Sequence, residues 1–129
     1  MRIGAIFTAI AASMMLAALA FADAPATSNK WRIELSGQAL SSGELVFRVT
    51  PRQGDATDII VSVRSGRAEN NVAKDVRDAF AAKLSPQRFS VEVDDGEDVL
   101  VKKKEGQPDF ALEVIEANVQ NVTIKVEGE

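Results

Sequence analysis

The residues best suited to chemistry form a short acidic cluster late in the sequence. The segment Asp94-Asp95-Gly96-Glu97-Asp98 offers carboxylate oxygens, which are the ligands that hard cations such as calcium prefer. The candidate metal ligands are Asp94, Asp95, Glu97 and Asp98. Calcium loops place their ligands at alternate positions around a bend, and this order does not follow that pattern. The cluster therefore favours the solvated tip of a hairpin over a metal site.

Three lysines follow the acidic cluster. Lys102, Lys103 and Lys104 could contact an anionic polymer of the cell envelope. Because they are followed by Glu105 in an acidic chain, they favour the protection of an edge strand instead.

Two other side chains are candidates for binding. Trp31 could stack on a sugar or a peptide, although its alternation with Ile33 and Leu35 favours an anchor in the core. Arg48 is a candidate because the arginine fork suits carboxylate or phosphate ligands.

The composition restricts the possible activities. The chain has no histidine and no cysteine, so serine–histidine and thiolate chemistry are excluded, and a zinc site would need carboxylates alone. We expect no cofactor. The composition favours a non-catalytic protein, with a carboxylate-based hydrolase as the catalytic alternative.

The N-terminus predicts export. Arg2 precedes an uncharged run from Ile3 to Leu19, and Ala20-Phe21-Ala22 matches a small-x-small cleavage site. Residues 1–22 therefore form a predicted signal peptide of bacterial type, with a single membrane anchor as the alternative. We expect a periplasmic or extracellular protein whose mature chain does not insert into a membrane.

The rest of the chain predicts a single domain. Residues 23–29 are small and polar and form a flexible lead, and residues 30–129 suffice for one α+β domain. A formal net charge of −4 gives no reason to expect a nucleic-acid partner.

Alternation of apolar and polar residues predicts the first three strands at residues 30–36, 44–50 and 58–64. For the second and third, the apolar pattern favours a register that sets Val49 opposite Ile59. The same register pairs Glu44 with Arg64 across the strands.

One amphipathic helix follows these strands. Asn70 or Asn71 is the predicted cap, and the helix runs to about Leu84. Its apolar stripe is Val72, Val76, Ala79, Phe80 and Leu84. Further strands are predicted at residues 89–93, 99–102, 110–115 and 121–127. An odd loop in the hairpin around the acidic cluster sets Val93 opposite Val99.

The predicted fold is α+β, a mainly antiparallel sheet of about seven strands in the order β-β-β-α-β-β-β-β with one helix packed on one face. Four apolar residues fall on the other face, namely Val46, Ile60, Leu100 and Ile115. Either the sheet curls so that they meet, or they form an exposed strip that needs a partner.

The sequence indicates a small exported binding or accessory domain whose partner is an unknown protein or envelope component. The alternatives are the carboxylate-based hydrolase and a structural protein that assembles through its sheet edges. The segment from Leu45 to Val101 is similar in rhythm to strand–strand–helix–hairpin modules of bacterial surface and phage structural proteins, which implies a non-catalytic module.

Cleavage after Ala22 is directly testable. Mass spectrometry of the exported protein should find Asp23 at the N-terminus, because Ala20 and Ala22 supply the small residues of the cleavage site. An exported chain that still begins at Met1 would refute the signal peptide.

Overall fold

Seven antiparallel strands and one helix make up the part of the chain that the structure, a computed structural model, describes: residues 24–129. The expected signal peptide lies outside these residues. The elements are β1 (Lys30–Ser36), β2 (Gly43–Pro51), β3 (Thr57–Val63), α2 (Glu69–Lys83), β4 (Phe89–Asp94), β5 (Asp98–Lys103), β6 (Phe110–Ala117) and β7 (Thr123–Gly128). The predicted fold class and element order are confirmed.

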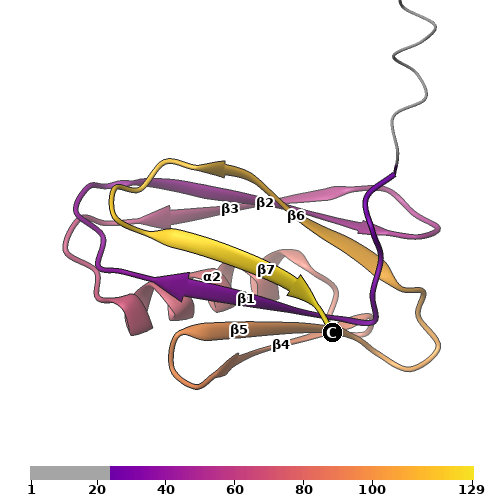
Figure 1. The fold of residues 1–129 in the computed structure, drawn as a ribbon. Helices are drawn as coiled ribbons and strands as arrows, with labels where there is room; N and C mark the ends of the chain where they lie inside the picture. Colours follow the sequence, from indigo (N-terminus) through magenta and orange to yellow (C-terminus); the bar gives the residue numbers. More distant parts are fainter. Residues whose placement is uncertain (1–23) are drawn as a thin grey trace, which may run out of the picture.

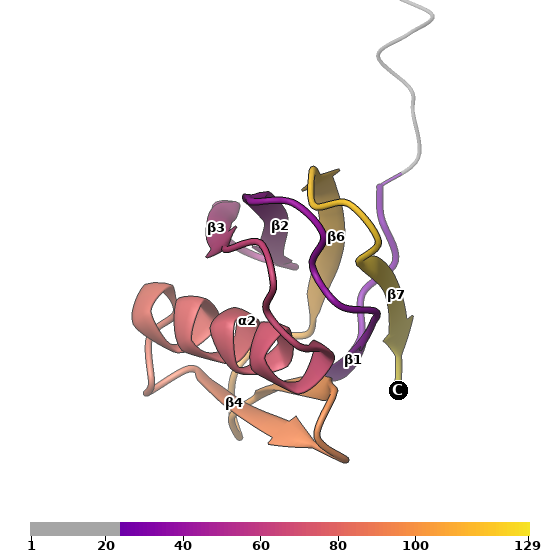
Figure 2. The ribbon, with the colours of Figure 1, turned by 90° about the vertical axis from the view of Figure 1, so that its left-hand side faces the viewer.

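The strands divide into two sheets that face each other (Figure 1). The four-stranded sheet has the order β4-β5-β1-β7, and the three-stranded sheet has the order β3-β2-β6. The last two strands therefore do not pair with each other, since β6 pairs with β2 and β7 pairs with β1. The strands β6 and β7 contact each other along one side of the molecule. On the opposite side α2 lies between β3 and β4 (Figure 2).

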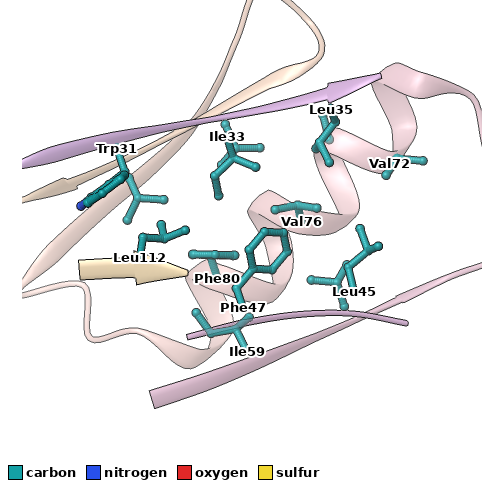
Figure 3. Packing of buried hydrophobic residues seen from close by; sticks show 14 of the residues in the cluster. Trp31, Ile33, Leu35, Leu45, Phe47, Ile59, Val72, Val76, Phe80 and Leu112 are labelled. Carbon is teal, nitrogen blue, oxygen red and sulfur yellow. The ribbon is translucent and has the colours of Figure 1, made fainter. Parts of the chain in front are cut away.

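The core lies between the two sheets and the helix. Trp31, Ile33 and Leu35 face it from β1, as their alternation predicts (Figure 3). Phe80 of α2 is fully buried, and its ring meets the edge of Phe47 from β2 with the centroids 5.2 Å apart. The helix thus contributes its apolar stripe to a core that both sheets share.

In the first hairpin, β2 and β3 bury the side chains that were predicted to be buried. The register in which the two strands pair differs from the prediction. Val49 lies opposite Thr57 and Phe47 lies opposite Ile59, two residues away from the predicted pairing. The predicted pair of Glu44 and Arg64 is therefore wrong, because β3 ends at Val63 and Glu44 lies opposite Ser62. A shift of two residues leaves every side chain on its face, so the apolar pattern does not distinguish the two registers.

The helix begins earlier than predicted. Its first residue is Glu69, and Ala68 at the N-cap makes no side-chain capping bond, so the asparagine cap is wrong. The Glu69 carboxylate instead accepts a hydrogen bond of 2.7 Å from the backbone N–H of Gly37. The predicted apolar stripe is confirmed, with Val72, Val76 and Phe80 buried. No helix among residues 24–129 is long and apolar enough to span a membrane.

The second hairpin has the predicted odd loop. Val93 lies opposite Val99 and Val91 lies opposite Val101. Asp95 and Gly96 both adopt a positive φ in the turn, at 53° and 82°. The faces of the strands are therefore a better guide to the register than the Asp-Gly dipeptide.

The four apolar residues of the second face do not all meet: Val46 and Ile60 are cross-strand partners, but Leu100 lies in the other sheet. Val46, Ile60 and Ile115 belong to the three-stranded sheet, whereas Leu100 belongs to the four-stranded sheet. Ile60 is 58% exposed, while Leu100 is only 6% exposed. The three-stranded sheet therefore keeps two of these apolar residues exposed, Ile60 and, at 42%, Ile115.

Because Phe80 packs in the core that both sheets share, we expect its removal to lower the stability of the domain strongly. Phe80→Ala should lower the free energy of unfolding by about 3–5 kcal/mol, because it leaves a cavity between the two sheets. Urea unfolding measures this loss. Lys74→Ala, at an exposed position of the same helix, should change stability by less than about 0.5 kcal/mol. Equal effects of the two substitutions would place the helix outside the core.

Candidate binding surface

β3 is one of the two edge strands of the three-stranded sheet; the other is β6, whose outer side makes a single bridge, between Phe110 and Ser28. β3 pairs with β2 on one side only, and no other backbone group within residues 24–129 bonds to its residues. Such an edge presents a row of N–H and C=O groups that can pair with another strand.

The helix α2 forms a shelf beside this edge. Figure 2 shows α2 below β3, extending past the free edge of the strand. A hollow of about 260 Å³ lies between them and is lined by Asp58, Ile59 and Ile60 of β3 and by Ala79, Ala82 and Lys83 of α2. The two alanines are the small side chains in this lining, and the hollow lies directly beside residues 58–60 of the strand.

Two further hollows extend this surface toward the two ends of β3. One, of about 680 Å³, is lined by Arg48, Ala56, Thr57, Asp58, Ile60 and Lys83. The other, of about 280 Å³, is lined by Ser62, Arg64, Arg67 and Asp75. We call the three hollows together the β3–α2 groove.

Helical geometry accounts for the side of the groove that α2 provides. Asp75, Ala79, Ala82 and Lys83 are spaced by four, three and one residues, so they share one face of the helix. This face adjoins the buried stripe of Val72, Val76 and Phe80. A single helix therefore closes the core and lines the groove.

An ion pair lies at each end of the groove. Arg48 donates two hydrogen bonds to Asp58, at 2.7 and 3.1 Å, and these bonds lower the pKa of the Asp58 carboxyl below its ordinary value. At the other end Arg67 donates to both carboxylate oxygens of Asp75, at 2.7 and 3.0 Å, which raises the pKa of Arg67. These bidentate pairs fix two arginines at the rim.

The groove is positively charged in an otherwise acidic chain. Besides the two ion pairs, its lining includes Lys83 at one end and Arg64 at the other. Neither of these two cations forms an ion pair with a described residue. The lining of each end therefore has two cations and one carboxylate, while Glu113, opposite Arg48, and Glu44, opposite Ser62, lie just outside it.

The acidic cluster of the sequence lies elsewhere, at the tip of the β4–β5 hairpin. Asp94 and Asp98 both accept hydrogen bonds from Arg32 Nη1, at 3.0 and 2.8 Å. Asp95 lies exposed in the turn, and the backbone oxygen of Glu97 accepts a bond from the Leu35 N–H. Within residues 24–129 no three of the Asp and Glu side chains converge as a metal site requires.

Arg32 also links this hairpin to Glu129, which directly follows β7, the other neighbour of β1. Its Nε donates to Glu129 at 2.7 Å, and Lys30 also pairs with Glu129 at 3.0 Å. These two cations lower the pKa of the Glu129 side chain, chiefly through the bond from Arg32. Three carboxylates therefore share one guanidinium on the outer face of the four-stranded sheet.

Two other binding residues predicted from the sequence, Trp31 and Arg48, lie apart from each other and from the acidic cluster. Trp31 is 9% exposed, and its Nε1 donates to the Phe110 backbone oxygen at 2.8 Å, which makes it a core anchor. Arg48 is the only candidate that the structure brings to the groove.

The lysine run does not protect an edge. Lys102 and Lys103 belong to β5, which pairs with β4 and β1 and is therefore an inner strand, so that interpretation is wrong. Lys102 pairs with Glu92 at 3.2 Å and Lys103 with Asp109 at 3.5 Å, while Lys104 is exposed. With Lys30, Glu105 and Glu129 they line an open hollow of about 570 Å³.

Comparison of the chain with models of known protein families, with curated proteins and with solved structures finds no match. The geometry of the groove is therefore the basis for a proposal about function.

Sequence reasoning missed the groove as a site. Ile60 gave one signal, because it is apolar on the polar face of its strand. The alanines at 79 and 82 gave none, since small residues on a helix have many uses. The hollows are formed by segments that are distant in the sequence, so only the fold brings them together.

The lowered pKa of Glu129 predicts a pH dependence of stability. The unfolded side chain has a pKa of about 4.3, so the ion pair stabilises the fold above that pH and is lost as the pH falls through the lower folded value. The difference in unfolding free energy between wild type and Glu129→Gln should therefore be positive at pH 7 and shrink toward zero at low pH. Chemical unfolding across this range measures it.

Glu116→Gln is the matched control, because Glu116 is exposed and forms no ion pair with a described residue. It should differ little from wild type at any pH. A constant difference for Glu129→Gln across the range would contradict the role of its charge.

Proposed function

We propose that this chain is a small exported, non-catalytic binding domain that holds a segment of a partner protein in the β3–α2 groove. The observation that supports this proposal is the unpaired edge of β3 above the alanine face of α2. The predicted signal peptide supports a partner outside the cytoplasm.

An open edge and a neighbouring helix suit the binding of an extended segment. A strand that is added to a sheet gains affinity from backbone hydrogen bonds and specificity from its alternate side chains. β3 has the sequence TDIIVSV, with neither lysine nor proline, the residues that commonly block an edge. The edge is thus chemically open along its length.

Assembly of this chain through its sheet edges is the second candidate, and the same open edge favours it. Two copies joined along β3 would form one continuous sheet with both helices on the same side. Because α2 extends past the edge of β3 (Figure 2), the two helices would meet beneath the joined strands. A single added strand has no such obstacle, so we prefer the binding function.

The carboxylate-based hydrolase needs two carboxylates across a cleft. Asp98 is the only buried charged residue in the part of the chain that the structure describes, and Arg32 holds it. No feature of residues 24–129 favours this alternative over binding.

Panning a random displayed peptide library on the purified exported protein tests the proposal. The recovered peptides should bind Ala82→Gln about tenfold or more weakly than wild type, because the longer side chain fills the floor of the groove. Ala81→Gln is the matched control, since it makes the same change at an exposed helix position that does not line the groove. Its affinity should be unchanged.

Failure to recover any peptide, or equal binding to both variants, would refute the groove as the binding surface. Light scattering of the free protein over a range of concentrations measures its molar mass and so tests the second candidate, assembly through the sheet edges. Association that increases with concentration and is lost in Ile60→Lys would favour assembly, because a charge on an edge strand opposes edge-to-edge pairing.

A further inference from the structure

We propose, building on the binding function above, that the β3–α2 groove selects an extended segment with a carboxylate at each end and apolar residues at alternate positions between them. The charges at the two ends of the groove and the apolar surface between them each support one part of this pattern.

The end charges favour an acidic partner. Arg48 and Arg67 are satisfied by Asp58 and Asp75, whereas Lys83 and Arg64 form no ion pair with any residue among 24–129. Each end therefore has one cation without a bonded carboxylate, although the charge of Lys83 also helps to lower the pKa of the nearby Asp58 carboxyl. A lysine or arginine at these positions of the partner would meet like charge at both ends.

The middle of the groove favours apolar side chains at alternate positions. A strand added to β3 places every second side chain on the inner face of the sheet, beside Ile59 and Val61. These side chains would lie over Ala79 and Ala82 of the shelf, where small and medium apolar groups fit. On the outer face the exposed side chain of Ile60 offers a further apolar neighbour.

The length of the segment follows from β3. This strand has seven residues, which span about 20 Å in an extended chain. Because both ends of the groove are positive, the charges admit the segment in either direction. The two carboxylates are therefore separated by about one strand length.

The pattern also distinguishes the occupant from a second copy of the chain. β3 itself carries one carboxylate, Asp58, near one end, and that carboxylate is already bound by Arg48. The β3 strand of another copy therefore lacks the second acidic end. We infer that the occupant is a segment of a different protein.

Two synthetic peptides test the inference. The probe is a fluorescein-labelled, amidated peptide of sequence Glu-Val-Thr-Val-Thr-Val-Glu, and its counterpart replaces both glutamates with lysine. Fluorescence anisotropy with the exported protein should show binding of the glutamate peptide that weakens as salt is added. The lysine peptide should bind at least about tenfold more weakly.

Substitutions of the two cations at the ends of the groove test whether the preference for the glutamate peptide arises there. Lys83→Gln and Arg64→Gln should each weaken the glutamate peptide by about two- to fivefold, as expected for one exposed ion pair. Lys74→Gln removes an exposed lysine of α2 that does not line the groove and should have no effect. An alternately N-methylated glutamate peptide should not bind, because it cannot pair with the edge.

The outcomes separate the two proposals. Equal binding of the glutamate and lysine peptides, or affinities that Lys83→Gln and Arg64→Gln leave unchanged, would overturn the acidic pattern while the binding function stands. If neither peptide binds but the panned peptides lose affinity in Ala82→Gln, the pattern is again wrong and the groove remains the binding surface. If the panned peptides also fail, both proposals fall.

Discussion

The position of α2 between the two sheets determines the rest of this structure. Phe80 and its neighbours fill the space that the sheets leave open between β3 and β4, so the core is complete only with the helix in place. A helix can bury the apolar inner faces of strands, but its own backbone bonds are internal, so it cannot pair with an edge strand. The edge of β3 is therefore left without a backbone partner in residues 24–129, beside a covered core. The contact between α2 and β3 that closes the core therefore also forms the β3–α2 groove.

The outer faces of the two sheets differ in how far their apolar residues are covered. On the four-stranded sheet Leu100 lies between Arg32 and Glu92, and the stems of these ion-paired side chains leave it only 6% exposed. On the three-stranded sheet Ile60 has no comparable cover. Ion-paired side chains thus cover the apolar residue on the outer face of the four-stranded sheet, whereas the outer face of the three-stranded sheet keeps Ile60 exposed.

The features that depend on periodicity, namely the strands, their buried faces and the helical stripe, could be predicted from the sequence. The pairing of one strand with another could not. Alternation placed the strands and their faces, and the helical stripe identified Phe80 as a core residue. The pairing of Glu44 with Arg64 was wrong because a two-residue shift preserves every face. The division into two sheets was missed because an alternating strand reports which side is buried but not which strand lies beside it. The groove was missed for the same reason, since residues from β2, β3 and α2 meet there only in the folded chain.

An open, lysine-free edge is usually a hazard, because identical edges can pair without limit. In this domain the shelf of α2 restricts what can reach β3. The proposed extended segment would occupy the hollow between the strand and the alanines, whereas a second sheet would bring its own helix into the same space. Arg48 and Arg67 at the rim are held by Asp58 and Asp75, so these two side chains have fixed positions beside the edge. Under the proposed function, the same helix that lies beside the edge would therefore limit strand addition to a single strand, which is what separates the proposed binding from assembly through the sheet edge.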